Sequence, residues 1–236
     1  MAFLTSGLVV RRGGWGKVAA SETRLRSGNS RWKAGRRAVV RCSEAAAKST
    51  GEVPVQTGVY STAGMTVEDF FKNSIGSWRS MRSSHNLAMS FMEEVNSEIE
   101  IEPVELAHES VLAICKQYET DPATAATAIK MSWEGTSDWD EDEVLEGSTL
   151  LVLVKDEDAK GRLLRSEGYA ETVPAVGEWS MEADGTFVLI TPYERASAEE
   201  RIWFTTPNMR VRVSFIRTQT GEGVLTASMS TEIREL

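Results

Sequence analysis

The chain has 236 residues, of which 41% are hydrophobic and 26% are charged, and this composition is ordinary for a globular protein. No stretch approaches the ~20 apolar residues that a membrane-spanning helix needs, so we expect no membrane insertion. With two cysteines and two histidines, the sequence offers no disulfide framework, no Cys/His zinc site and no multi-histidine metal centre.

The net charge of −9 is divided unequally along the chain. Residues 1–64 carry 11 Lys and Arg against 3 Asp and Glu, whereas residues 65–236 carry 15 against 32. The acidic second part argues against DNA, RNA or an anionic membrane surface as a partner, because all of these repel negative charge.

The basic N-terminal segment is rich in Arg and Ser, and Glu22 is its only acidic residue before Cys42. This composition is typical of an organelle transit peptide, and residues 39–43 resemble a plastid processing site. We therefore expect residues 1–42 to direct the protein to the plastid, with a nucleic-acid-binding arm as the alternative. Residues 43–64, rich in Ala, Ser, Thr and Gly, indicate a flexible linker before a folded domain at 65–236.

Short helices are expected near the start of this domain. Thr66 can cap a helix that has an apolar face and ends at Gly76. Residues 109–119 place apolar side chains, including Cys115, at helical spacing. Asp121 followed by a proline predicts another short helix.

The rest of the domain has the pattern of strands and turns. Residues 97–102 alternate polar and apolar, and we expect further strands at 127–134, 148–154, 162–173, 186–193, 200–206, 209–217 and 224–233. The connections are too short for crossover helices, so neighbouring strands should be antiparallel. About eight to ten such strands must close or stack to protect their edges, and a meander with helices near its start favours a ligand-holding barrel.

Residues 209–216 allow two interpretations. One face carries Arg210, Arg212 and Ser214, and the other carries Val211, Val213 and Phe215. The common arrangement puts the valines in the core and the arginines in water. A ligand barrel permits the reverse, with two arginines that bind carboxylates in bidentate fashion.

The preceding strand places Glu200 on the same face as Ile202 and Phe204. If this face is inward, burial should raise the pKa of Glu200 and suit it for proton exchange or for binding a cation. If Glu200 instead lies at the end of the strand, at the mouth of the barrel, its carboxylate is solvated. A hairpin at Pro207 could bring Glu200 and the arginine pair to one cavity.

Aromatic side chains gather around residues 129–139. Ile129, Met131 and Trp133 share one face of a predicted strand, and Trp139 follows six residues later. Such a stripe is more often plain core, but a planar conjugated ligand would also pack against these rings.

These segments resemble the S-type phycobiliprotein lyases, bilin-binding, chaperone-like enzymes that attach linear tetrapyrroles to light-harvesting proteins. The resemblance covers about residue 65 to 236. Its motifs are FF at 70–71 with GSWRSMRSSH at 76–85, MSWEG at 131–135, and ERIWFTTPNMRVR at 200–212, of which the last is the most specific.

The resemblance implies a mainly β fold, a lipocalin-like, ten-stranded antiparallel β-barrel that is often a homodimer. It implies a bilin substrate, with phycoerythrobilin expected, an apo-phycobiliprotein acceptor such as the phycoerythrin β-subunit, and no metal or nucleotide cofactor. The site residues that it implies are Glu200 as the catalytic residue; Arg210, Arg212 and Ser214 as polar pocket residues; Met131, Trp133 and Trp139 as apolar walls; and Arg82 and Ser83 as mouth or pocket contacts.

In the reaction that this suggests, the arginine pair binds the bilin propionates and Glu200 bonds the pyrrole N–H groups. A cysteine thiolate of the acceptor then adds to the ethylidene carbon and forms a thioether. Cys115, on an apolar helix face, should be structural. Two alternatives remain: a lipocalin-like or fatty-acid-binding-like carrier without transfer activity, and a solidly packed scaffold with Arg210 and Arg212 facing outward.

Overall fold

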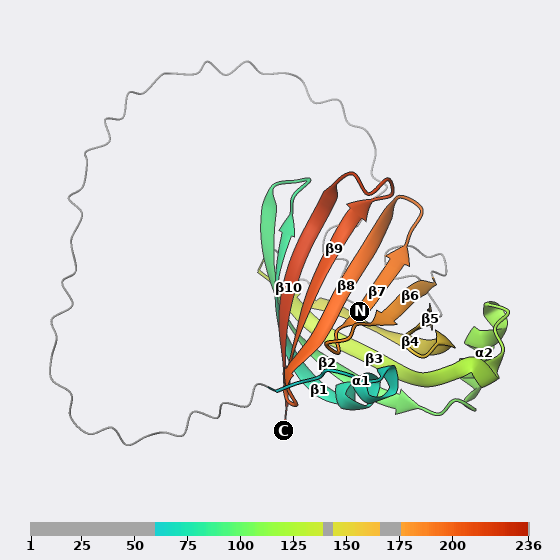
Figure 1. Cartoon of the computed structure of the whole chain (residues 1–236). Coiled ribbons are helices and arrows are strands. Elements are labelled where there is room, and N and C mark those ends of the chain that lie inside the picture. The colour runs from blue at the N-terminus through green and yellow to red at the C-terminus, as the bar shows by residue number, and fades with distance from the viewer. Residues whose placement is uncertain (1–59, 139–143, 166–175, 236) are drawn as a thin grey trace, which may run out of the picture. The chain divides into compact units, whose positions relative to one another are not determined.

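The computed structural model describes residues 60–138, 144–165 and 176–235 and contains a closed antiparallel barrel of ten strands (Figure 1). Each strand pairs with its neighbours in the chain, and β10 pairs with β1 to close the sheet. The predicted lipocalin-like barrel with short helices is therefore confirmed. The elements are α1 (Val67–Ser74), β1 (Gly76–Asn86), β2 (Phe91–Val104), α2 (Glu109–Gln117), η1, a 3₁₀ turn (Pro122–Thr124), β3 (Ala125–Ser137), β4 (Val144–Glu157), β5 (Lys160–Arg165), β6 (Gly177–Met181), β7 (Phe187–Pro192), β8 (Ala196–Thr206), β9 (Met209–Thr218) and β10 (Val224–Arg234).

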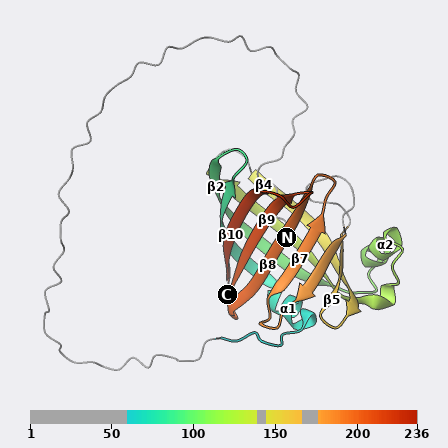
Figure 2. The same ribbon diagram turned by 45° about the horizontal axis from the view of Figure 1, so that its top comes forward.

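Helix α1 lies across one end of the barrel (Figures 1 and 2). Thr66 caps it, since its hydroxyl oxygen accepts a hydrogen bond from the Asp69 amide at 3.1 Å. The apolar face of the helix packs into the barrel, where Phe70 stacks on Phe187 with ring centroids 5.0 Å apart and also contacts Phe204. This end of the interior is therefore filled by apolar and aromatic side chains.

Helix α2 covers part of the outer face of the barrel, beside β4 and β5 (Figure 1). Its residues Val111, Ile114 and Cys115 pack on outward-facing Val152 and Leu164. The apolar run at residues 150–154 is explained by this arrangement, because one side of β4 faces the interior and the other lies under α2. Cys115 is fully buried there, as its place on the apolar helix face predicts, and burial raises the pKa of its thiol.

The expected transit peptide and all but the last five residues of the expected linker lie outside the described residues. Within the described part of the chain, no helix is both long and apolar enough to cross a membrane.

Candidate functional site

Strand β9 presents its arginines to the barrel interior. Arg210 and Arg212 are each 2% exposed, and Ser214 is buried beside them. The interpretation that leaves the arginines in water is therefore wrong, and so is the outward orientation that the scaffold alternative requires. The physical reason lies on β10, where Glu232 stands opposite Arg210 in the register and supplies a buried countercharge.

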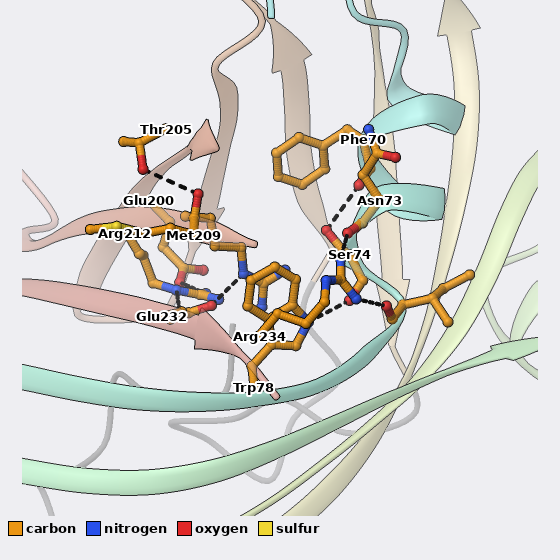
Figure 3. Close-up of polar contacts among 12 residues, drawn as sticks. Phe70, Asn73, Ser74, Trp78, Glu200, Thr205, Met209, Arg212, Glu232 and Arg234 are labelled. Carbon is orange, nitrogen blue, oxygen red and sulfur yellow. Dashed lines mark hydrogen bonds and ion pairs between the residues drawn. The ribbon is translucent and has the colours of Figure 1, made fainter. Parts of the chain in front are cut away.

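Two arginines and two glutamates form one buried network, which we call the Arg–Glu cluster (Glu200, Arg210, Arg212 and Glu232). Arg212 donates from Nη1 to Glu200 Oε1 and from Nε to Glu232 Oε1, each at 3.0 Å, and Arg210 Nε donates to Glu232 Oε2. Figure 3 shows Arg212 beside both carboxylates. Three adjacent strands, β8, β9 and β10, thus contribute to a cluster with no net charge.

Both carboxylates of the cluster are ionised. Burial alone would raise their pKa values, but nearby positive charges outweigh it. The pKa of Glu232 falls to about 2 beside Arg210 and Arg212, and the pKa of Glu200 is also lowered, an effect to which Arg212 and Arg165 contribute. The expectation that burial raises the pKa of Glu200 is therefore wrong, because Glu200 is not an isolated carboxylate in an apolar row.

The cluster is connected to α1 through stacked side chains. The Trp78 ring lies 4.5 Å from the guanidinium carbon of Arg210 and 4.2 Å from that of Arg234. Trp78 Nε1 donates to the Ser74 carbonyl at 2.9 Å, and Arg234 donates to the carbonyls of Asn73 and Ile75 (Figure 3). These contacts fix the C-terminal end of α1 against the base of the cluster.

A second group of buried polar side chains lies on β1, β2 and the end of β3. Arg82 is buried on the inner face of β1, and Ser137 Oγ donates to buried Glu93 Oε1 at 2.6 Å. Ser83 does not join this group, because it lies on the outer face of β1, with its hydroxyl 3.4 Å from His85 Nε2. Adjacent residues of a strand point to opposite faces, so Arg82 and Ser83 cannot both face the interior.

Of the three side chains predicted as apolar walls of the pocket, the structure describes Met131 and Trp133. Met131 is buried in the interior core, and Trp133 is partly buried against that core. Gly147 of β4 makes room for the indole, since a Cβ there would lie 2.3 Å from Trp133 Cζ2. Trp139 lies outside the described residues.

The described interior carries a positive excess. Four arginines are buried there (Arg82, Arg165, Arg210 and Arg212) against three buried glutamates (Glu93, Glu200 and Glu232). This excess of one positive charge contrasts with the acidic chain around it. Buried arginines and carboxylates of this kind suit a ligand that carries both acidic groups and N–H donors. No group of three or more His, Cys, Asp or Glu among the described residues could hold a metal ion.

Sequence reasoning missed Glu232 and Trp78 as members of the site. Alternation in the sequence separates Ser230 and Glu232 from Met229 and Ile233, but the structure is needed to show that the first pair is buried and the second exposed. The alternation along β10 is thus inverted in the same sense as that of β9, with polar residues inside.

Comparison with known proteins places the chain in one family. The model of the CpeS-like protein family matches residues 66–235. The chain is 54% identical over 172 residues to chromophore lyase CpcS/CpeS 3 of Trichodesmium erythraeum. This match covers 72% of this chain and 99% of that protein. It is 45% identical over 159 residues to the putative phycoerythrobilin lyase CpeS of Microchaete diplosiphon, covering 65% of this chain and 70% of that protein.

A solved structure agrees with these relatives. The S-type phycobiliprotein lyase CPES from Guillardia theta is 58% identical to the chain, with a TM-score of 0.67 over 74% of this chain and 96% of that one. The inverted strands, the buried Arg–Glu cluster and these matches lead to one conclusion: the chain belongs to the CpeS-like protein family of chromophore lyases.

Proposed function

We propose that this lyase binds a linear tetrapyrrole of the phycoerythrobilin type inside its barrel and transfers it to a cysteine of an apo-phycobiliprotein β-subunit. Family membership gives the enzyme class, and a relative that is 45% identical is named as a putative phycoerythrobilin lyase. The observation that carries the proposal is the Arg–Glu cluster, which holds two ionised carboxylates on the inner face of the barrel, buried beside two arginines.

In this proposal, the carboxylates of Glu200 and Glu232 accept hydrogen bonds from pyrrole N–H groups and hold the bilin in one geometry. The arginines position both carboxylates, and Arg210 Nη2 is buried with no hydrogen-bond partner among the described residues. That nitrogen is therefore available to a propionate of the ligand. Ser214 and Arg82 complete the polar surface, while Met131, Trp133 and Trp139 would pack against the pyrrole rings.

The chemical step is an addition, so it needs no oxidant and no leaving group. The acceptor's thiolate sulfur bonds to the ethylidene carbon, the electron pair of the double bond moves into the conjugated system, and the proton lost by the thiol returns to the tetrapyrrole. The enzyme contributes mainly by positioning and by keeping water from the ethylidene group. We therefore propose that neither a metal nor a nucleotide cofactor takes part.

The chain's location and assembly belong to the same proposal. Residues 1–42 would direct it to the plastid, where its acceptor is made or imported, and the mature barrel would act as a monomer or homodimer. Import of the full chain into isolated plastids, with shortening near Cys42, tests the first point.

The experiment is an absorption titration of the full chain with phycoerythrobilin, followed by addition of apo-phycoerythrin β-subunit. We expect a sharpened, shifted visible band that saturates at one bilin per chain, and then colour that stays on the β-subunit after denaturation. Binding without stable colour would support the carrier alternative instead. No spectral change with any bilin would contradict bilin binding altogether.

A further inference from the structure

A buried cation lies on the wall of the barrel that faces the Arg–Glu cluster. Arg165 is the last residue of β5 and is 3% exposed. In the closed order of strands, β5 lies four steps from β9 and five from β10, so Arg165 enters the interior from the opposite wall. It shares the inner face of β5 with Leu163, whereas Leu164 between them packs under α2.

The contacts of Arg165 hold it in place without neutralising it. Its Nη2 donates to Thr191 Oγ1 at 3.1 Å, and its backbone carbonyl accepts from the Tyr118 hydroxyl at 2.7 Å, which anchors the end of β5. Among residues 60–138, 144–165 and 176–235, no carboxylate lies within 4.0 Å of its guanidinium group. Its buried Nε also has no hydrogen-bond partner in that part of the chain.

The sheet leaves room for this side chain. Because β6 lies between β5 and β7, the bond from Arg165 to Thr191 spans the inner face of β6. Gly177 stands on that face, and a Cβ there would lie 2.7 Å from Leu189 Cδ1 and 3.2 Å from Thr191 Oγ1. A larger residue at 177 would therefore displace the hydroxyl group that orients Arg165.

The additional positive charge of the described interior is therefore that of Arg165, which lies outside the Arg–Glu cluster. The cluster is neutral, while Arg165 is a buried cation whose side-chain partner in the described part of the chain, Thr191, is uncharged. An uncompensated buried charge is unfavourable for folding, and such a group is retained where a ligand supplies the opposite charge. Arg165 also lowers the pKa of Glu200, so the two groups act on one interior.

We infer that Arg165, oriented by Thr191, forms a separate subsite for a carboxylate of the ligand. The inference rests on the proposed function, in which that carboxylate is a propionate of the bilin. The two walls then bind different parts of the ligand. Strands β8 to β10 present carboxylates to N–H donors and Arg210 to one propionate, and β5 with β7 presents Arg165 to the other propionate.

The test compares Arg165→Gln with wild type in absorption titrations of the full chain, using phycoerythrobilin and its dimethyl ester. We expect Arg165→Gln to weaken binding of the diacid by about tenfold or more, the loss of one charge-assisted hydrogen bond. The two proteins should bind the ester equally, because the ester carries no carboxylate. Thr191→Val, which removes only the orienting hydroxyl, should change diacid binding in the same direction by a smaller factor.

Arg162→Gln is the matched control. It makes the same change three residues earlier on β5, at an outward-facing arginine paired with Asp156, and should bind both ligands as wild type does. The apo form of Arg165→Gln should melt at or above the temperature of wild type, since a buried charge with no carboxylate partner among the described residues is removed.

Two results would overturn the subsite: equal diacid affinity in Arg165→Gln and wild type, or an equal loss of diacid and ester with a lowered melting temperature, which would make Arg165 structural. If wild type itself bound no bilin, the proposed function would fail instead.

Discussion

Glu232 of β10 lies directly opposite Arg210 of β9 in the strand register, and their side chains form an ion pair inside the barrel. Glu232 is fully buried and also accepts a hydrogen bond from Arg212 Nε at 3.0 Å. One carboxylate therefore compensates two buried guanidinium groups, and the stability of the barrel should depend on it more than on an ordinary glutamate.

Glu232→Gln should lower the free energy of unfolding in urea by about 3–5 kcal/mol, because it leaves two buried arginines with one remaining carboxylate. Glu178→Gln, on the exposed face of β6, is the control and should change stability by less than about 0.5 kcal/mol. Equal urea midpoints for Glu232→Gln and wild type would show that this carboxylate does not stabilise the fold.

The same carboxylate predicts an acid dependence of stability. Its pKa is lowered from the ordinary 4.5 to about 2 in the folded protein, so the unfolded chain binds the proton more tightly than the folded one. The stabilisation is therefore complete above about pH 4.5 and is lost as the pH falls toward about 2. Urea unfolding between pH 6 and pH 2.5 should show a steeper loss for wild type than for Glu232→Gln, and parallel curves would contradict the lowered pKa.

Glu200→Gln separates the proposed ligand role from folding. The amide oxygen can still accept the bond from Arg212, but the negative charge is lost, so we expect bilin affinity to fall by about tenfold or more while the barrel stays folded. Glu199→Gln is the matched control on the outer face of the same strand, where Glu199 pairs with Arg201 and Arg217. Titration with phycoerythrobilin measures both, and equal affinity in the two variants would exclude Glu200 from the site.

The fold was largely predictable because its signals are local. Capping at Thr66, helical spacing around Cys115 and alternation on β8, β9 and β10 each depend on a few adjacent residues, and the short connections fixed the antiparallel order. Strand β6 was missed because it has five residues and contains Gly177. The expected strand at 162–173 is described only as far as Arg165.

The candidate site was harder to predict because its energetics are not local. Alternation on β9 separates Arg210 and Arg212 from Val211 and Val213 but does not say which set faces inward. The answer depends on Glu232, 22 residues further along, since without that countercharge inward arginines would be prohibitively costly. The pKa of Glu200 was misjudged for the same reason, because its partner Arg212 belongs to the next strand.

Two arginines near α1 offer a test of how burial decides the strength of an interaction. Arg234 stacks on Trp78 and donates to two carbonyls at the C-terminal end of α1, whereas Arg79 forms an exposed ion pair with Glu235 at 3.0 Å. Arg234→Ala should cost about 2 kcal/mol or more, since it removes a cation–π contact and two charge-assisted hydrogen bonds. Arg79→Ala should cost less than about 1 kcal/mol, because water screens exposed pairs. Urea unfolding of both variants measures the difference, and similar costs would mean that Arg234 does not hold α1 on the end of the barrel.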